Sequence, residues 1–225
     1  MPPTATLEDI KAYQQKVEKN KITPHNLPPC PRCRVDSSFF KIHAYRERRF
    51  LIIIEMLIQA AYCSLVRFAC PGCGKTFSFY PDFAIPHKHY TRPTITGFSA
   101  GYVESDDTTY QQAVMIDRSA PGYPQSDLSA DAPTLAPSTI HRWITTLGRF
   151  THTCRTALIL LLQENPVSSI CRDLARLVIG QRKHNSNLRK KQLVNCRQLV
   201  VIEAFFQAAF KTSIFTKLAT RCAFS

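Results

Sequence analysis

The chain has 225 residues, 44% of them hydrophobic, which is enough to build one or two compact domains. Its 29 lysines and arginines against 16 aspartates and glutamates give a formal net charge of +13, which attracts polyanions such as DNA, RNA or anionic membrane surfaces. The alternative is a basic soluble protein with no charged partner. A count of 7 glycines and 15 prolines argues against a flexible low-complexity chain.

The first 27 residues predict a helical arm. Residues 7–19 have the pattern of a short polar helix, and residues 23–31 are proline-rich and favour extended backbone. The first sixteen residues contain no apolar run, so no signal peptide is expected. The nine cysteines are then expected in a reducing cytoplasm, where paired Cys-x-x-Cys motifs indicate metal binding.

The next part, 28–92, has strand signals. Residues 37–50 predict a strand and a turn, and residues 75–83 alternate aromatic with polar side chains, as a strand does. The apolar run 51–68 fits one or two strands of a hairpin, and its periodicity does not separate this from a buried helix. Glu55 and Gln59 interrupt the run and argue against a membrane span.

Helical patterns dominate the remainder of the chain. Residues 94–116 are expected to be helical in part, 117–137 form a proline-rich linker, and 138–147 form a short amphipathic helix. From residue 151 the pattern is helical, with a break at Asn165–Pro166. The fold class predicted is α+β, with a small sheet at 28–92, a helical region with a helix-turn-helix-like element at 93–150, and a C-terminal helical region at 151–225.

Four cysteines predict a metal centre. Cys30-Pro-Arg-Cys33 and Cys70-Pro-Gly-Cys73 are two thiolate pairs, and two such knuckles give the tetrahedral S4 coordination that Zn²⁺ accepts. The 36 intervening residues leave room for a hairpin, which is the zinc-ribbon plan. A four-thiolate site leaves no position for a catalytic water, so the zinc is expected to be structural. A redox pair, free core thiols and an iron–sulfur site are the alternatives. The other five cysteines are interpreted as buried small hydrophobes: Cys63, Cys154, Cys171, Cys196 and Cys222.

The helix predicted at 138–147 is the candidate recognition element. Its apolar residues are spaced i, i+3, i+4 and i+7 and define one buried stripe. The opposite face carries short polar and basic side chains, which suit phosphates and base edges in a major groove: Ser138, Thr139, His141 and Arg142. An ordinary surface helix is the alternative, and the proline-rich stretch before it is unlike the short turn of a helix-turn-helix.

A longer motif resembles the N-terminal zinc-binding region of transposase-like proteins of bacterial insertion sequences. The residues that carry the resemblance are Cys30-Pro-x-Cys33, His43, Tyr45-Arg46, Arg67-Phe68-x-Cys70-Pro-x-Cys73-Gly74, Thr76-Phe77-Ser78-Phe79-x-Pro81-Asp82-Phe83-x-x-Pro86 and Tyr90. The segment Ser138-Thr139-Ile140-His141-Arg142-Trp143 is similar to the helix-turn-helix that follows in that group. The resemblance covers about residues 30–150 and implies DNA binding and a mobile-element origin.

The sequence departs from those transposases in three ways. Its hairpin connection is unusually apolar, its linker at 117–137 is long, and no catalytic domain with three metal-binding carboxylates can be placed. The leading hypothesis is therefore a zinc-dependent, non-catalytic DNA-binding protein. Its expected nucleic-acid contacts combine the helix above with a basic strip: Arg46, Arg48, Arg67, Lys75, Lys88 and Arg92.

Two hypotheses from other classes stay open. An active transposase or nuclease with a cryptic acidic site predicts that Asp82, Asp117 and Asp173 cluster and that cleavage needs Mg²⁺. A protein–protein adaptor predicts an exposed apolar surface on residues 159–162 or 200–210. DNA is the expected partner and no membrane is, and a homo-oligomer is left open.

Overall fold

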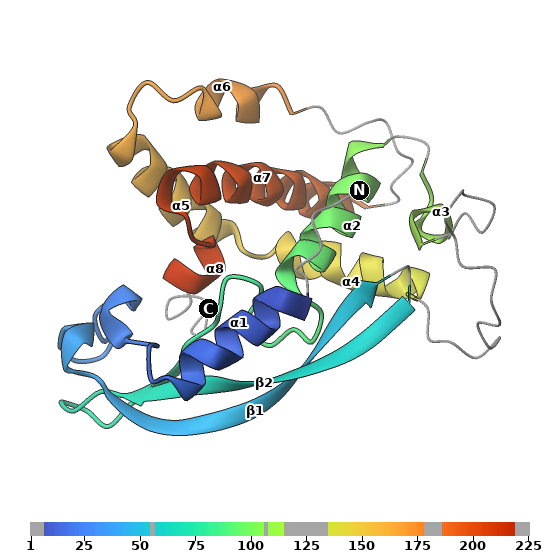
Figure 1. Cartoon of the computed structure of the whole chain (residues 1–225). Helices are drawn as coiled ribbons and strands as arrows, with labels where there is room; N and C mark the ends of the chain where they lie inside the picture. The colour runs from blue at the N-terminus through green and yellow to red at the C-terminus, as the bar shows by residue number, and fades with distance from the viewer. Residues whose placement is uncertain (1–6, 55–56, 106–107, 115–134, 178–185, 219–225) are drawn as a thin grey trace.

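The computed structural model describes residues 7–54, 57–105, 108–114, 135–177 and 186–218. Within these ranges the chain is α+β, as predicted, with a three-stranded antiparallel sheet and several helices (Figure 1). The helices are α1 (Leu7–Glu18), α2 (Arg92–Glu104), α3 (Tyr110–Val114), α4 (Pro137–Leu147), α5 (Thr151–Glu164), α6 (Ile170–Ala175), α7 (Asn187–Phe210) and α8 (Ile214–Lys217). Most of the predicted linker 117–137 lies outside the described residues.

The sheet is a long hairpin with a short third strand. Strands β1 (Lys41–Ile54) and β2 (Leu57–Ala69) pair from Lys41↔Ala69 to Ile54↔Leu57, so the apolar run 51–68 is a hairpin and not a helix. Strand β3 (Thr76–Ser78) pairs with β2 and is shorter than the predicted 75–83. One more backbone hydrogen bond follows, from the Phe79 N–H to the Val66 carbonyl. Pro81 has no N–H to donate to a neighbouring strand, and the chain leaves the sheet there.

Helix α1 packs on β2 and closes the first of two hydrophobic cores, called here the sheet core. Ile10, Tyr13 and Val17 recur along one face of α1 at the spacing of a helix and are buried. Opposite them the sheet contributes Phe50 and Phe68, which are at most 1% exposed. The metal-ligand candidates lie at one end of this core, because Cys30 and Cys70 belong to the same cluster of buried residues.

The second core, called here the helical core, lies among α2, α4, α5 and α7. The predicted stripe of α4 is confirmed, since Ile140, Trp143, Ile144 and Leu147 are all buried in it. The far end of the hairpin also reaches this core, where Ile53 is buried (Figure 1). Residues 89–91 pair with Leu51 of β1 and bring the chain from the sheet to the start of α2.

Polar contacts join the two cores at the start of α2 and the end of α7. Arg92 forms an ion pair with Glu203, with 3.1 Å between guanidinium and carboxylate, and both side chains are largely buried. Asp82, just after the sheet, accepts hydrogen bonds from the Thr212 hydroxyl and the Ser213 N–H, which precede α8. A buried ion pair and two hydrogen bonds to the exposed Asp82 carboxylate therefore hold the sheet and the C-terminal helices in one arrangement.

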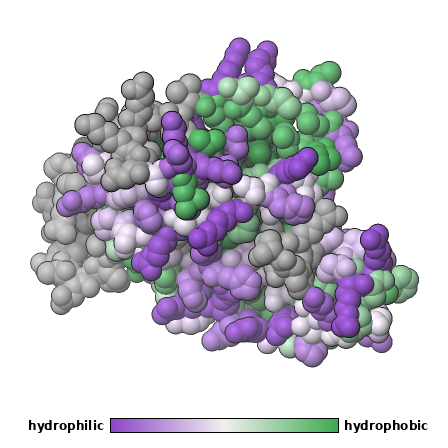
Figure 2. Space-filling view, turned by 180° about the vertical axis from the view of Figure 1, so that it is seen from behind, coloured by the Kyte–Doolittle hydropathy of each residue, from purple (hydrophilic) through white to green (hydrophobic). Residues whose placement is uncertain are grey.

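Apolar side chains gather on one part of the surface. Figure 2, which views the molecule from behind, shows them in the upper right, and this corresponds to the upper left of Figure 1, where α5 lies. Ile159 on α5 is 49% exposed, and Val167, between these helices, is 91% exposed. Among the described residues, one helix, α7, is long and apolar enough to cross a membrane by length and composition, a criterion that core helices of soluble proteins also meet.

Candidate metal centre and nucleic-acid interface

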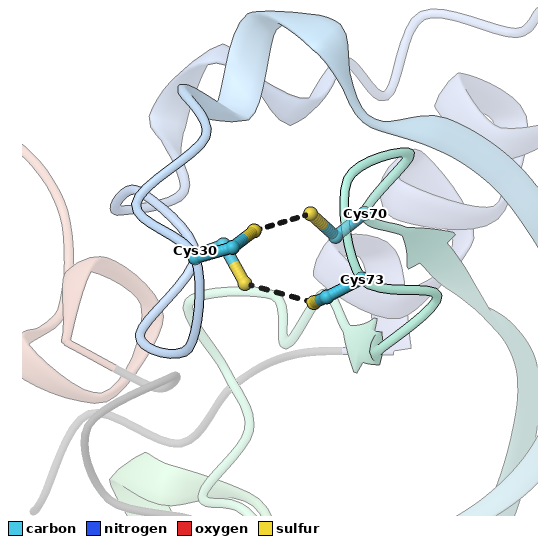
Figure 3. A group of neighbouring side chains, drawn as sticks. Cys30, Cys70 and Cys73 are labelled. Atoms are coloured by element: carbon cyan, nitrogen blue, oxygen red, sulfur yellow. Dashed lines mark hydrogen bonds between the residues drawn. The ribbon is translucent and has the colours of Figure 1, made fainter.

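The two Cys-x-x-Cys knuckles face each other across the end of the sheet. Cys30 and Cys33 precede β1, and Cys70 and Cys73 form the turn between β2 and β3 (Figure 3). Because β1 and β2 pair antiparallel, the start of one strand lies beside the end of the other, as Lys41↔Ala69 shows. The hairpin thereby brings together cysteines that are about forty residues apart in the sequence.

The two knuckles have the same backbone conformation. In each, the N–H of the fourth residue after the first cysteine bonds back to that cysteine's carbonyl, from Arg34 to Cys30 at 2.8 Å and from Gly74 to Cys70 at 2.9 Å. That fourth residue is left-handed in both, with φ of 61° at Arg34 and 69° at Gly74. The second knuckle thus uses a glycine where the first holds an arginine in a conformation that costs non-glycine residues energy.

The sulfur geometry fits a four-thiolate metal site. Sγ of Cys30 lies 3.5 Å from Sγ of Cys73, Sγ of Cys33 lies 3.4 Å from Sγ of Cys70, and all four lie within 4.8 Å of one another. Tetrahedral coordination with metal–sulfur bonds of about 2.3 Å places sulfurs about 3.8 Å apart. A Cβ on Gly72 would lie 2.9 Å from Val35 and 3.2 Å from Sγ of Cys33, so the close approach of the knuckles requires a glycine there. The four cysteines could therefore hold a metal ion.

The thiols of the first knuckle are unequal. Burial raises the pKa of Cys30, but the N–H groups of Cys33 and Arg32 and the neighbouring thiols outweigh it and lower this pKa to about 6. For Cys33 the Val35 N–H lowers the pKa, but the nearby thiols, Cys70 first, raise it to about 12. Four thiolates this close repel one another, and a bound cation is what allows all of them to ionise.

The remaining cysteines are placed differently from one another. Cys63 and Cys196 are buried, as predicted, and burial raises the pKa of each to about 12, which makes them poor nucleophiles. Cys154 is partly buried, whereas Cys171 is exposed on α6, so its predicted burial is wrong. No pattern in the sequence around Cys171 indicates that this short helix lies on the surface. Cys222 lies outside the described residues.

The six residues of the predicted basic strip do not form one continuous strip. Arg67 donates to the Thr76 hydroxyl of β3 at 2.7 Å, and Arg92 is committed to Glu203. Lys75 lies beside the second knuckle, where its carbonyl accepts from the Cys70 N–H, and Arg46 is exposed on β1. The structure does bring two members together.

Arg48 and Lys88 are these two members. The Arg48 guanidinium donates to the Lys88 carbonyl at 3.1 Å and lies over the rings of Phe50 and Tyr80. The Lys88 ammonium in turn donates to the Thr146 hydroxyl of α4 at 3.0 Å. The basic residues after the sheet and the polar face of α4 therefore meet.

The polar face of α4 points away from the helical core. Ser138, His141 and Arg142 are exposed, and Thr139 is partly buried. Thr145 and Thr146 donate their hydroxyls to carbonyls one turn back, so each oxygen remains an acceptor for a cation. Arg189, at the start of α7, donates to Thr145 at 2.9 Å. Sequence reasoning did not place Arg189 here, because its partner lies in a different helix 44 residues earlier in the chain.

The cations around α4 raise the local potential. Desolvation lowers the pKa of Lys88, and the nearby charge of Arg142 lowers it further. The pKa of His141 is lowered in the same way, first by partial desolvation of its exposed ring and then by the charge of Arg189. Within the described ranges, the one ion pair is Arg92–Glu203, so no carboxylate pairs with Lys88, Arg142 or Arg189 there. This concentration of unpaired positive charge is suited to an anionic ligand.

The acidic residues considered for catalysis are committed or undescribed. Asp82 accepts from Thr212 and Ser213, Asp173 accepts from the Ser169 hydroxyl at 2.8 Å, and Asp117 lies outside the described residues. Among the side chains that the structure describes, the four knuckle cysteines are the one group of three or more metal-ligating residues that come together.

Comparison with known families places the chain. Residues 30–143 match the family described as a domain of unknown function, DUF6431. The match begins at the first knuckle cysteine, ends within α4 and covers half of the chain, so this protein belongs to that family. No curated protein and no solved structure matches the chain. The matched residues include both knuckles and the sheet, whereas α5 to α8 lie outside them.

Proposed function

We propose that this protein is a zinc-dependent DNA-binding protein, related to insertion-sequence transposases and without a catalytic domain of its own. In this proposal the metal is a structural Zn²⁺ on Cys30, Cys33, Cys70 and Cys73, and the hairpin with β3 is a zinc ribbon. The S4 donor set and the facing knuckles support zinc over harder metals, which prefer oxygen ligands. The proposed location is a cytoplasm in which these cysteines stay reduced.

The observation that carries the proposal is the exposed face of α4 with cations at its borders. Ser138, His141 and Arg142 are available to base edges, while Lys88 and Arg189 hold positive charge beside them. Arginine and short hydroxyl side chains are what a recognition helix presents in a major groove. A merely structural surface helix would not explain why these cations gather with no carboxylate paired to them among the described residues.

The helices before α4 support a helix-turn-helix-like arrangement. Helix α3 packs against both α2 and α4, and α2 also contacts α4, which gives a three-helix group with α4 last. A standard helix-turn-helix joins its last two helices by three or four residues. Here α3 ends at Val114 and α4 begins at Pro137, so the proposed element carries a much longer connection.

The test is salt-dependent binding to duplex DNA of mixed sequence. Each neutralised phosphate contributes about 0.9 to the slope of log affinity against log salt concentration, so several contacts give a steep slope. An Arg142→Gln variant is expected to weaken binding by about 1–3 kcal/mol, the worth of one good arginine–base contact. Arg155→Gln, an exposed arginine on α5, is the matched control and is expected to bind as the parent does. Affinity that does not change with salt would sink the proposal.

A second candidate, a protein–protein adaptor, rests on the apolar surface over α5 and α6. Ile159 on α5 and Val167 between α5 and α6 are exposed, and a protein interface would bury them. If the partner is a second copy of the chain, light scattering will show a mass that rises with protein concentration. Val167→Lys is then expected to keep the protein monomeric, and a mass that is constant at all concentrations would remove this candidate.

A further inference from the structure

The first turn of α7 is docked on the polar face of α4. Ser186 caps α7 by accepting from the Arg189 N–H, which fixes the start of the helix. The Arg189 side chain then donates to the Thr145 hydroxyl of α4, to Gln192 of its own helix, and to the Tyr110 hydroxyl of α3. These bonds use three of the five N–H groups of a guanidinium and leave others for a further acceptor.

Arg189 and Lys88 lie on opposite sides of the exposed α4 face. Successive helical residues are 100° apart, so Ser138 and Arg142 mark the middle of that face. Thr145 then lies on one side of the middle and Thr146 on the other. Arg189 bonds Thr145, and Lys88, from the segment after the sheet, bonds Thr146. Two cations from distant parts of the chain thus flank the residues proposed to read bases.

This arrangement matches the electrostatics of a helix in a major groove. The groove is about 12 Å wide and is bordered on each side by a phosphate backbone, so a helix within it has anions at both borders. Gathering Lys88, Arg142 and Arg189 around one short helix costs repulsion in the free protein, because no carboxylate among the described residues pairs with them. Phosphates on both sides would offset that repulsion.

We propose that Arg189 is a phosphate-contacting residue on the border of α4 opposite Lys88, which makes the start of α7 part of the DNA-binding surface. The inference rests on the proposed function and extends it. Arg189 lies outside the residues matched to the family, so the C-terminal helices contribute directly to binding and are more than a support for α4. A contact of this kind strengthens binding to any duplex sequence and carries no base preference.

The test compares the salt dependence of duplex binding in four variants of the full-length protein. Arg189→Gln is expected to lower the slope of log affinity against log salt by about 0.9 and to weaken binding about tenfold at ~0.1 M salt. Arg189→Lys keeps the charge and is expected to keep the slope. Lys190→Gln is the matched control, because Lys190 is the next residue of α7 and is exposed. This variant is expected to leave the slope unchanged.

Tyr110→Phe separates phosphate contact from positioning. It removes the hydroxyl that Arg189 bonds on α3 and leaves every charge in place. A loss of slope in Tyr110→Phe, or an equal loss in Lys190→Gln, would overturn the inference, because Arg189 would then act by positioning α3 and α4 or as one of many equivalent charges. If Arg189→Gln keeps the salt slope of the parent protein, the inference about Arg189 is also overturned, but the proposed function stands. If the parent protein shows no salt-dependent binding to duplex DNA, the proposed function itself fails. The same conclusion follows if the parent protein binds single-stranded RNA and no duplex DNA.

Discussion

The sheet core and the helical core achieve their stability in different ways. The sheet core has one helix, three strands and a loop end that holds four cysteines, two of them not buried. The helical core takes buried residues from α2, α4, α5, α6, α7 and α8, and several of its members, such as Ile140, Ile144 and Phe206, are 0% exposed. The helical core is held together by packed apolar side chains, whereas under the proposed function the knuckle end of the sheet core is also held by a metal ion.

The difference indicates where the proposed metal would contribute to stability. Around the knuckles Arg32, Cys33 and Arg34 are exposed, while Cys30 and Cys70 are buried in the sheet core. In zinc-finger peptides the binding of a structural zinc supplies about 10–16 kcal/mol of folding free energy, and the proposed zinc would act on the knuckles in the same way. Metal removal is therefore expected to affect the two regions unequally.

The largest effect is expected from Cys70→Ser, which removes one ligand of the proposed site. The variant should lose the metal and the ordered structure of the knuckles and β3, while α4, α5 and α7 keep their helical signal. Metal analysis together with amide hydrogen exchange measures both parts. Cys63→Ser, in the same core but outside the knuckles, is the control and should retain the metal. A Cys70→Ser protein that keeps one metal per chain with native exchange protection would contradict the metal-based account.

A smaller effect is expected from the ion pair that joins the two regions. Burial raises the pKa of Glu203, and the Arg92 guanidinium opposes that shift by stabilising the carboxylate. Arg92→Met leaves Glu203 buried and unpaired and is expected to cost about 3–5 kcal/mol in the free energy of unfolding. Denaturant titration is the measurement.

The double variant Arg92→Met, Glu203→Met sharpens this comparison. With both charges gone, most of the lost stability should return, because apolar pairs often replace buried ion pairs at little cost. Arg92→Met should also keep the parental salt dependence of DNA binding, since its guanidinium faces α7 and not the surface of α4. A double variant as unstable as the single one would show that packing around Arg92, and not its charge, joins the regions.

The smallest effect is expected at the knuckle glycine with positive φ. Nothing lies within 4 Å of a Cβ added to Gly74, so Gly74→Ala adds backbone strain without a clash. The left-handed conformation is expected to cost about 1–2 kcal/mol, seen as a lower melting temperature of the metal-loaded protein. Gly101→Ala, in α2 and equally open, is the control and should be neutral or stabilising by up to about 1 kcal/mol. Equal melting temperatures for both variants would mean that the turn relaxes without strain.

Local patterns in the sequence predict the features that depend on residues close together in the chain. The stripe of α4 and the paired knuckles depend on spacing within a few residues, and the structure has both. The pattern of residues 51–68 fits a strand and a buried helix equally, and only the antiparallel pairing of β1 with β2 decides between them. The length of β3 likewise depended on where its partner strand stopped bonding.

Contacts between distant segments could not be predicted. Gly148 follows α4 as expected of a helix stop, but its φ of −66° is ordinary helical backbone and needs no glycine. The reason for a glycine is α7, whose Gln192 carbonyl would lie 2.5 Å from an added Cβ. The sequence predicts Arg92 on a basic strip because nothing near it in the chain indicates its ion-pair partner, Glu203.

The outer edge of β1 has a consequence for how the protein behaves at high concentration. β1 is 14 residues long and pairs with β2 on one side, while on its other side the described residues pair with it at Leu51 alone. A long open edge invites strands of other molecules and leads to aggregation. Here the bulge between Ile42 and Ala44 and the exposed charges of Arg46 and Arg49 interrupt such an edge. Neutralising those arginines would therefore be expected to lower solubility whether or not they touch a ligand.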